Sequence, residues 1–167
     1  TGSLKTGTTA MIAAFEAIQG GKKDRILLSA SDRREAKAGY FYEMWFGDGA
    51  ASLLLGKENV IAELKGSYSL SYDFPDHYRD AQKKYDYIWE ERWIRDEGYI
   101  KILPEAIGGL LKKYGLSIGD FSKIVYPCFF SREHAAIGKK IGASPQALQG
   151  NMHETTGEMG AAHPLAM

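Results

Sequence analysis

Several features are scarce in this sequence, and each shortage excludes a class of protein. The 167 residues include one cysteine, Cys128, so no disulfide can form within the chain, and a reducing, cytoplasmic location is the simplest expectation. No apolar run approaches the roughly 18 residues of a membrane-spanning helix, so we expect no membrane span. Charge of either sign is not in excess: 21 Lys and Arg balance 21 Asp and Glu, which argues against nucleic-acid binding.

What the sequence does contain is typical of a folded domain with clustered glycines. Hydrophobic residues make up 44% and charged residues 25%, which is ordinary for a globular protein and wrong for a disordered one. The length fits one domain or one lobe of a larger protein. The chain starts at Thr1 without a Met and stops within an apolar pattern that ends at Met167. We therefore expect a fragment of a longer protein.

Hydrophobic periodicity predicts helices that alternate with strands. Apolar residues at helical spacing, capping residues and glycine stops predict helices over 8–19, 31–37, 80–96, 99–114 and 131–141. Short apolar or alternating runs predict strands over 25–31, 41–46, 50–55, 60–72 and 123–126, the first of them buried on both faces. A further helix is expected to begin near Gly157. This alternation indicates an α/β architecture.

Four segments, in chain order, resemble motifs of one superfamily. Residues 46–52 read Phe-Gly-Asp-Gly-Ala-Ala-Ser and are similar to the Gly-Asp-Gly-Ala-Ala motif of the thiolase superfamily. Residues 4–11 resemble its nucleophile turn and the helix that follows. Residues 123–142 resemble its strand, histidine turn and helix, and residues 157–162 resemble its asparagine turn. The resemblance is to the branch that holds β-ketoacyl-ACP synthase III and 3-hydroxy-3-methylglutaryl-CoA (HMG-CoA) synthase.

The resemblance implies a fold and a division of the chain. The fold would be α/β, a thiolase-like layered fold with mixed sheets and buried helices, present only in part. Residues 1–72 would be the end of the first half of that fold. Residues 73–98, rich in aromatic and charged side chains, would form a loop–helix insertion that lines an acyl tunnel, faces a partner or simply packs in the core. Residues 99–167 would be a truncated second half.

The resemblance also implies where a catalytic site would lie. In the family, a Cys thiolate at a helix N-terminus takes an acyl group from coenzyme A or acyl carrier protein, and a His and an Asn support the later steps. Carried over by position, the nucleophile falls on Leu4, the histidine on Pro127 or Cys128, and the asparagine on Glu158. All three family residues are therefore replaced. The alternative is that this segment is misaligned with the family and that Leu4 is an ordinary core leucine.

Two groups of residues carry alternative chemistry. Cys128 is either a nucleophile near the start of a helix, with His134, His153 or His163 as its base, or a small buried residue at a strand end. Ahead of the predicted C-terminal helix stand further polar residues. They form a proton-transfer set, a metal site or a polar loop that caps the helix: His153, Glu154, Glu158 and His163. Their spacing matches no metal motif, so we expect no metal site.

Three glycines are assigned to substrate binding. Gly47 and Gly49 flank Asp48 in what reads as a tight hairpin turn near the floor of the site, and Gly157 opens the asparagine turn. The first pair lacks the Lys and Ser or Thr of a P-loop and the third glycine of a dinucleotide fingerprint. Phosphate binding by this turn is therefore not expected.

These expectations combine into one functional hypothesis with two alternatives. The chain would be a thiolase-fold subunit of an acyl-CoA condensing, HMG-CoA synthase-like complex, non-catalytic or reprogrammed because its Cys-His-Asn site is replaced. The resemblance implies acyl-CoA or acyl carrier protein as ligand, no covalently bound cofactor, and either a homodimer or a hetero-oligomer with a catalytic thiolase and a zinc-ribbon/OB-fold protein. The alternatives are an active acyltransferase that uses Cys128 or Glu158, and a scaffold that binds acyl-CoA without reacting it.

Overall fold

The structure is a computed structural model, and it describes residues 5–167; the predicted nucleophile position, Leu4, lies outside the described residues. The described chain forms two compact units. The first combines residues 5–67 with His153–Met167, and the second is Tyr68–Met152. This division by compactness differs in kind from the division by thiolase halves, which stays a prediction. Among the described residues, none of the helices combines the length and apolar character needed to cross a bilayer.

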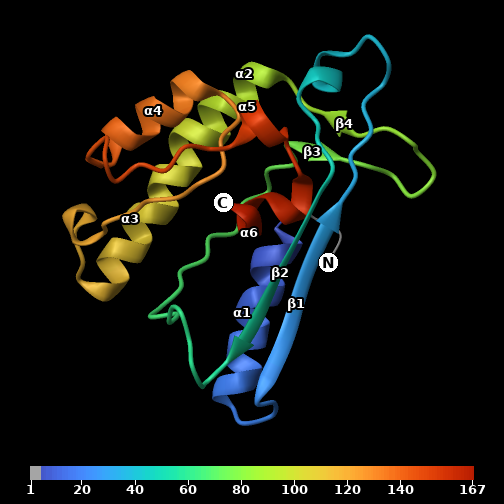
Figure 1. Cartoon of the computed structure of the whole chain (residues 1–167). Coiled ribbons are helices and arrows are strands. Elements are labelled where there is room, and N and C mark those ends of the chain that lie inside the picture. Colours follow the sequence, from blue (N-terminus) through green and yellow to red (C-terminus); the bar gives the residue numbers. More distant parts are fainter. Residues whose placement is uncertain (1–4) are drawn as a thin grey trace. The chain divides into compact units, whose positions relative to one another are not determined.

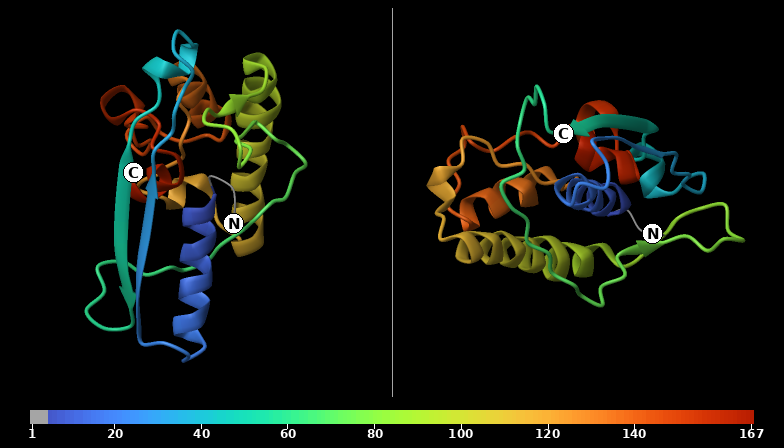
Figure 2. Two further views of the ribbon diagram at one scale, coloured as in Figure 1. Left: turned by 90° about the vertical axis from the view of Figure 1, so that its right-hand side faces the viewer. Right: turned by 90° about the horizontal axis from the view of Figure 1, so that it is seen from below.

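The first unit is built on a two-stranded antiparallel sheet covered by a helix (Figure 1). Strand β1 (Arg25–Asp32) pairs antiparallel with β2 (Gly49–Gly56) along its whole length, and α1 (Thr6–Gln19) runs beside them (Figure 2). Leu28 and Leu55 are buried with Ala14 and Ile18 of α1. On the opposite face, Leu27 is 68% and Leu54 is 70% exposed. The expectation that β1 is buried on both faces is therefore wrong for this chain.

The connection between β1 and β2 corrects three predictions. Residues 33–37 are irregular rather than helical, and the predicted strand over 41–46 is instead a 3₁₀ turn, η1 (Phe41–Met44). The turn buries Tyr42 and stacks its ring on Phe46, with centroids 5.6 Å apart and planes at 20°. Burial of this aromatic side chain thus overrides the extended pattern. Since 41–46 is not a strand, Gly47 and Gly49 do not close a hairpin.

The C-terminal segment completes the first unit with three short helical turns. These are α5 (His153–Thr156), η4 (Gly160–Ala162) and α6 (His163–Ala166). The segment joins the rest of the unit through a parallel bridge between Phe46 and Glu158, and α6 contacts both β2 and α1. Gly157 and Glu158 lie between α5 and η4, so the helix expected from Gly157 begins later than predicted.

The second unit is organised by one long helical rod. Helix α2 (Glu91–Trp93), the π-helix η2 (Ile94–Ile102) and α3 (Leu103–Tyr114) follow one another without a break (Figure 1). The rod starts where the Glu90 side chain accepts hydrogen bonds from the N–H groups of Arg92 and Trp93, which is an N-cap. It ends at Gly115, whose φ of 65° gives the left-handed stop that the sequence predicted.

Ahead of this rod, the predicted helix over 80–96 is wrong for residues 80–90. Short strands β3 (His77–Tyr78) and β4 (Tyr87–Ile88) pair there as a small hairpin. Trp89 therefore lies before the helix rather than on its face, although its ring remains 6.1 Å from that of Trp93. Trp93 in turn stacks on Phe74 at 4.0 Å. Residues 60–72, predicted as one long strand or a pair of strands, have no regular secondary structure.

The core of the second unit lies under α4 (Ser131–Lys140), which packs on η2 and α3. Ile124, Tyr126, Cys128, Ile137 and Ala147 form this core. The strand predicted over 123–126 is reduced to a single parallel bridge between Ile124 and Leu148. A short 3₁₀ turn, η3 (Ile118–Asp120), joins α3 to this region.

Candidate functional site

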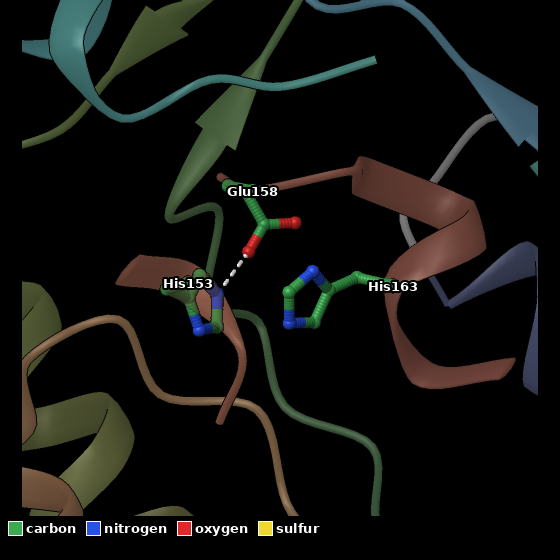
Figure 3. A group of neighbouring side chains, drawn as sticks. All are labelled: His153, Glu158 and His163. Atoms are coloured by element: carbon green, nitrogen blue, oxygen red, sulfur yellow. Dashed lines mark hydrogen bonds and ion pairs between the residues drawn. The ribbon is translucent and has the colours of Figure 1, made fainter. Parts of the chain in front are cut away.

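The first unit holds a largely buried cluster of ionisable side chains: His153, Glu158 and His163 (Figure 3). Each offers one nitrogen or oxygen atom, and these atoms lie within 4.8 Å of one another. Nε2 of His153 and Oε2 of Glu158 share a hydrogen bond of 2.7 Å. The two imidazole rings stack with centroids 4.0 Å apart. Three of the four residues assigned to a possible proton-transfer set therefore meet, while Glu154 is exposed.

The carboxylate of Glu158 is held from two sides. Its Oε1 accepts a hydrogen bond of 2.8 Å from the N–H of Gly160 and lies 4.0 Å from Nη1 of Arg34. Burial by itself would raise the pKa of Glu158, but the hydrogen bond from His153 and the charges of the two histidines and Arg34 outweigh it, so this pKa lies below its usual value. Glu158 is consequently a carboxylate at neutral pH, although only 13% of its side chain is exposed.

Arg34 is the member of this site that the sequence did not reveal. It follows β1, its side chain is buried, and its guanidinium lies 3.9 Å from the centre of the Phe46 ring. Cation–π contact and the nearby carboxylate together offset the cost of burying this charge. No local motif marks Arg34, because only the fold brings it to the C-terminal segment.

The three predicted substrate-binding glycines frame Glu158. The N–H of Gly47 donates to the carbonyl of Glu158 at 3.1 Å, and the N–H of Glu158 donates to the carbonyl of Trp45 at 2.7 Å. A Cβ on Gly47 would overlap the carbonyl oxygen of Thr156, and Gly157 has a φ of 70° that side chains rarely adopt. A Cβ on Gly49 would lie 2.6 Å from that of Met159. Their shown role is close chain approach; substrate binding stays a prediction.

Cys128 lies in the second unit and is fully buried. Its Sγ donates to the carbonyl of Phe130 at 3.6 Å, and its own carbonyl accepts from the side chain of Asn151. Burial raises the pKa of the thiol to about 12, whereas reactive cysteines have lowered pKa values and partial exposure. These surroundings are those of a packing residue, and a nucleophilic role for Cys128 stays a prediction.

His134, a candidate base for Cys128, is also buried in the second unit. Its ring lies 4.7 Å from that of Tyr126, whose hydroxyl donates to the carbonyl of His134 at 2.7 Å. The other two candidate bases, His153 and His163, belong to the first unit and to the cluster around Glu158.

Comparison with known proteins finds archaeal HMG-CoA synthases that resemble this chain in sequence. No family model matches the chain. The HMG-CoA synthase of Pyrobaculum aerophilum is 28% identical over 124 residues, which are 74% of this chain and 35% of the relative. Other archaeal HMG-CoA synthases match similarly, among them that of Methanobrevibacter smithii, at 27% identity over 99% of this chain and 48% of the relative. The chain thus spans less than half the length of these curated relatives.

Solved structures share the fold. A crystal structure of an HMG-CoA synthase complexed with CoA superposes with a TM-score of 0.82 at 18% identity, covering 99% of this chain and 46% of that one. The 3-oxoacyl-(acyl carrier protein) synthase III of Pseudomonas aeruginosa gives 0.80 at 18% identity, covering 99% and 55%. The α/β fold predicted from sequence is confirmed as about half of a thiolase fold. The predicted resemblance to the thiolase superfamily, in the branch of HMG-CoA synthase and β-ketoacyl-ACP synthase III, is confirmed: the chain is similar in sequence to HMG-CoA synthases and in fold to both kinds of enzyme.

Proposed function

We propose that this chain is a CoA-thioester-binding subunit of an acyl-CoA condensing, HMG-CoA synthase-like assembly, and that its site is non-catalytic or reprogrammed because it forms no acyl-cysteine. One observation carries the proposal: Glu158, which the resemblance assigns to the asparagine position, is largely buried and held as a carboxylate. The replacements at Leu4 and at Pro127 or Cys128 point the same way. A cytoplasmic location stays part of the proposal.

The charge of Glu158 is what makes the family's chemistry unworkable in its usual form. An asparagine amide donates N–H groups toward the oxygen on which negative charge develops during condensation. An ionised carboxylate only accepts hydrogen bonds, and its negative charge repels an enolate oxygen. Retaining the same reaction would therefore need a different source of positive charge at this position.

A CoA thioester is the ligand that the relatives favour. One structural neighbour was solved with CoA and another, a MvaS protein, with 3-hydroxy-3-methylglutaryl coenzyme A. This chain covers 46% and 50% of those proteins, and the proposal is that this part of the fold binds a CoA thioester by itself. A partner that supplies the missing cysteine, such as a catalytic thiolase working with a zinc-ribbon/OB-fold protein, fits this role.

A second candidate, acid–base chemistry in a reprogrammed site, is favoured by the 2.7 Å hydrogen bond between His153 and Glu158. A histidine oriented by a buried carboxylate is a common device for moving a proton. In this version the chain still forms no acyl-enzyme, but His153→Gln would abolish any exchange of the α-protons of a bound acyl-CoA with solvent deuterium.

The test of the proposal measures acylation and binding separately. The purified chain is incubated with acetyl-CoA and analysed by intact mass, and the binding of a non-hydrolysable CoA analogue is followed by calorimetry. We expect saturable binding without a covalent adduct, in the wild type and in Cys128→Ala alike.

An acyl adduct lost in Cys128→Ala would replace the proposal by an active acyltransferase that uses Cys128. Binding without turnover, alone and with a catalytic thiolase added, would mark a non-reactive scaffold. Absence of CoA binding would contradict the proposal outright.

A further inference from the structure

We infer that His153, Glu158 and His163 form a binding site for a divalent transition-metal ion of the zinc class. This inference deepens the proposed function, since it rests on the view that the cluster has replaced the family's site. It also revises the expectation of no metal, which rested on sequence spacing alone. The three residues span an irregular turn whose geometry no linear motif describes.

The ligand chemistry of the cluster is that of zinc. Two imidazoles and one carboxylate form a set that binds Zn²⁺ in metalloenzymes, where three protein ligands leave the fourth position open. Nitrogen and carboxylate oxygen together favour Zn²⁺ and similar ions over Mg²⁺ or Ca²⁺, which prefer oxygen alone. All three groups come from one stretch of 11 residues, bent so that their side chains converge (Figure 3).

The distances require only small adjustments. With bonds of about 2.0–2.1 Å, tetrahedral ligand atoms lie about 3.3 Å apart. The three ligand atoms here lie within 4.8 Å of one another, and the pair formed by His153 and Glu158 is already in contact at 2.7 Å. Nδ1 of His163 accepts a hydrogen bond of 3.4 Å from the N–H of Met159, which is long and therefore weak. Rotations of the side chains that move the ligand atoms by roughly an ångström would bring all three atoms to one ion.

The two oxygens of Glu158 already have separate partners. Oε1 is fixed by the N–H of Gly160 and faces Arg34, while Oε2 points to His153. Outer hydrogen bonds of this kind orient a ligating carboxylate and leave one oxygen for the metal. The positive charge of Arg34 opposes a cation, so the affinity depends on all three ligands acting together. Removal of any one of them should therefore be costly.

A metal here would also resolve the electrostatic problem posed by Glu158. A bound Zn²⁺ with an open position polarises a carbonyl oxygen as a Lewis acid. It would present positive charge where the family's asparagine presents N–H groups, and Glu158 would serve as its ligand rather than repel the substrate. The cluster would thus support a thioester carbonyl without any cysteine.

The experiment measures metal binding without CoA. The full chain is stripped with a chelator, dialysed and titrated with Zn²⁺ by calorimetry, and Co²⁺ is added separately to record the visible absorption of a tetrahedral site. We expect one equivalent per chain. His153→Gln and Glu158→Gln keep side-chain size and should each weaken binding by at least about tenfold, the loss that even outer-shell changes produce. His77→Gln is the control, because His77 pairs with Asp76 outside the cluster and should bind like the wild type.

Thermal unfolding keeps the result readable if a variant is destabilised. Zn²⁺ should raise the Tm of the wild type and of His77→Gln, and not that of the two cluster variants. Lack of a stoichiometric site, or equal affinity in the wild type and both cluster variants, would overturn the inference. So would a loss confined to His77→Gln. Binding of the CoA analogue, measured on the same chain, separates the two proposals. If the chain binds the analogue but has no metal site, only this inference is overturned. If it binds the metal but not the analogue, only the proposed function is overturned.

Discussion

Each compact unit buries a cluster of side chains, and the two clusters have opposite chemistry. In the first unit, Arg34, His153, Glu158 and His163 are packed together, with a 2.7 Å hydrogen bond between His153 and Glu158 and Arg34 4.0 Å from the carboxylate. In the second, Ile124, Tyr126, Cys128, Ile137 and Ala147 form an ordinary apolar core. Burial of ionisable groups costs free energy, whereas burial of apolar groups supplies it. From this comparison we expect the first cluster to matter for chemistry and the second for stability.

The largest effect should come from Ile137→Ala in the apolar cluster. Ile137 is fully buried, so the loss of its side chain leaves a cavity and lowers the free energy of unfolding by about 2–5 kcal/mol. Urea unfolding measures this change. The matched control is Leu27→Ala on the open face of β1, where the leucine is 68% exposed and the loss should stay within about 0.5 kcal/mol. Equal losses at the two sites would mean that the cluster is not the core of its unit.

An intermediate effect is expected from Gly47→Ala, which acts on the frame of the polar cluster. The new Cβ would overlap the carbonyl of Thr156, and the strain should cost about 1–3 kcal/mol. It should also shift Glu158, which the backbone of Gly47 holds, and so weaken metal binding. Gly108→Ala is the control: a Cβ there meets nothing within 4 Å in helix α3, so stability should rise by about 0.5–1 kcal/mol. A Gly47→Ala chain as stable as the wild type would refute the close approach.

The contrast between the units also explains what the sequence could predict. Helices α1 and α4 and strands β1 and β2 follow from local periodicity, and the end of α3 follows from the glycine at position 115. The failures lie where tertiary contacts decide. Tyr42 turns the chain to bury its ring, and Glu90 caps a helix that begins at Glu91, whereas the sequence placed its start at residue 80. Short segments without strong propensity are the ones such contacts override.

The candidate site shows the same division. The sequence singled out His153, Glu158 and His163 as polar residues beside a family motif, but it left open whether their side chains meet or only cap a helix. Their convergence depends on positive φ values at Gly157 and Gly160 and on Asp32, whose carboxylate accepts a hydrogen bond from the N–H of Ala161 at 3.2 Å. Asp32 and Arg34 come from the end of β1, far away in the sequence. Such long-range contacts leave no local signal.

The smallest expected effect concerns Cys128, and it tests whether the apolar cluster is inert. Because burial raises the pKa of this thiol to about 12, its thiolate population near pH 8 should be about a thousandfold smaller than that of an ordinary exposed thiol. Alkylation by iodoacetamide should be correspondingly slow in the folded chain, fast in urea, and faster as pH rises.

A thiol whose pKa is raised by folding stabilises the fold below about pH 9 and loses that contribution as pH rises toward 12. We expect Cys128→Ala to lower the free energy of unfolding by only about 1 kcal/mol at neutral pH. The free energy of unfolding of this variant should also fall less steeply than that of the wild type as the pH rises above about 9. Rapid alkylation of the folded chain would instead show an accessible thiolate, and Cys128 would then not be a purely structural residue of the apolar cluster.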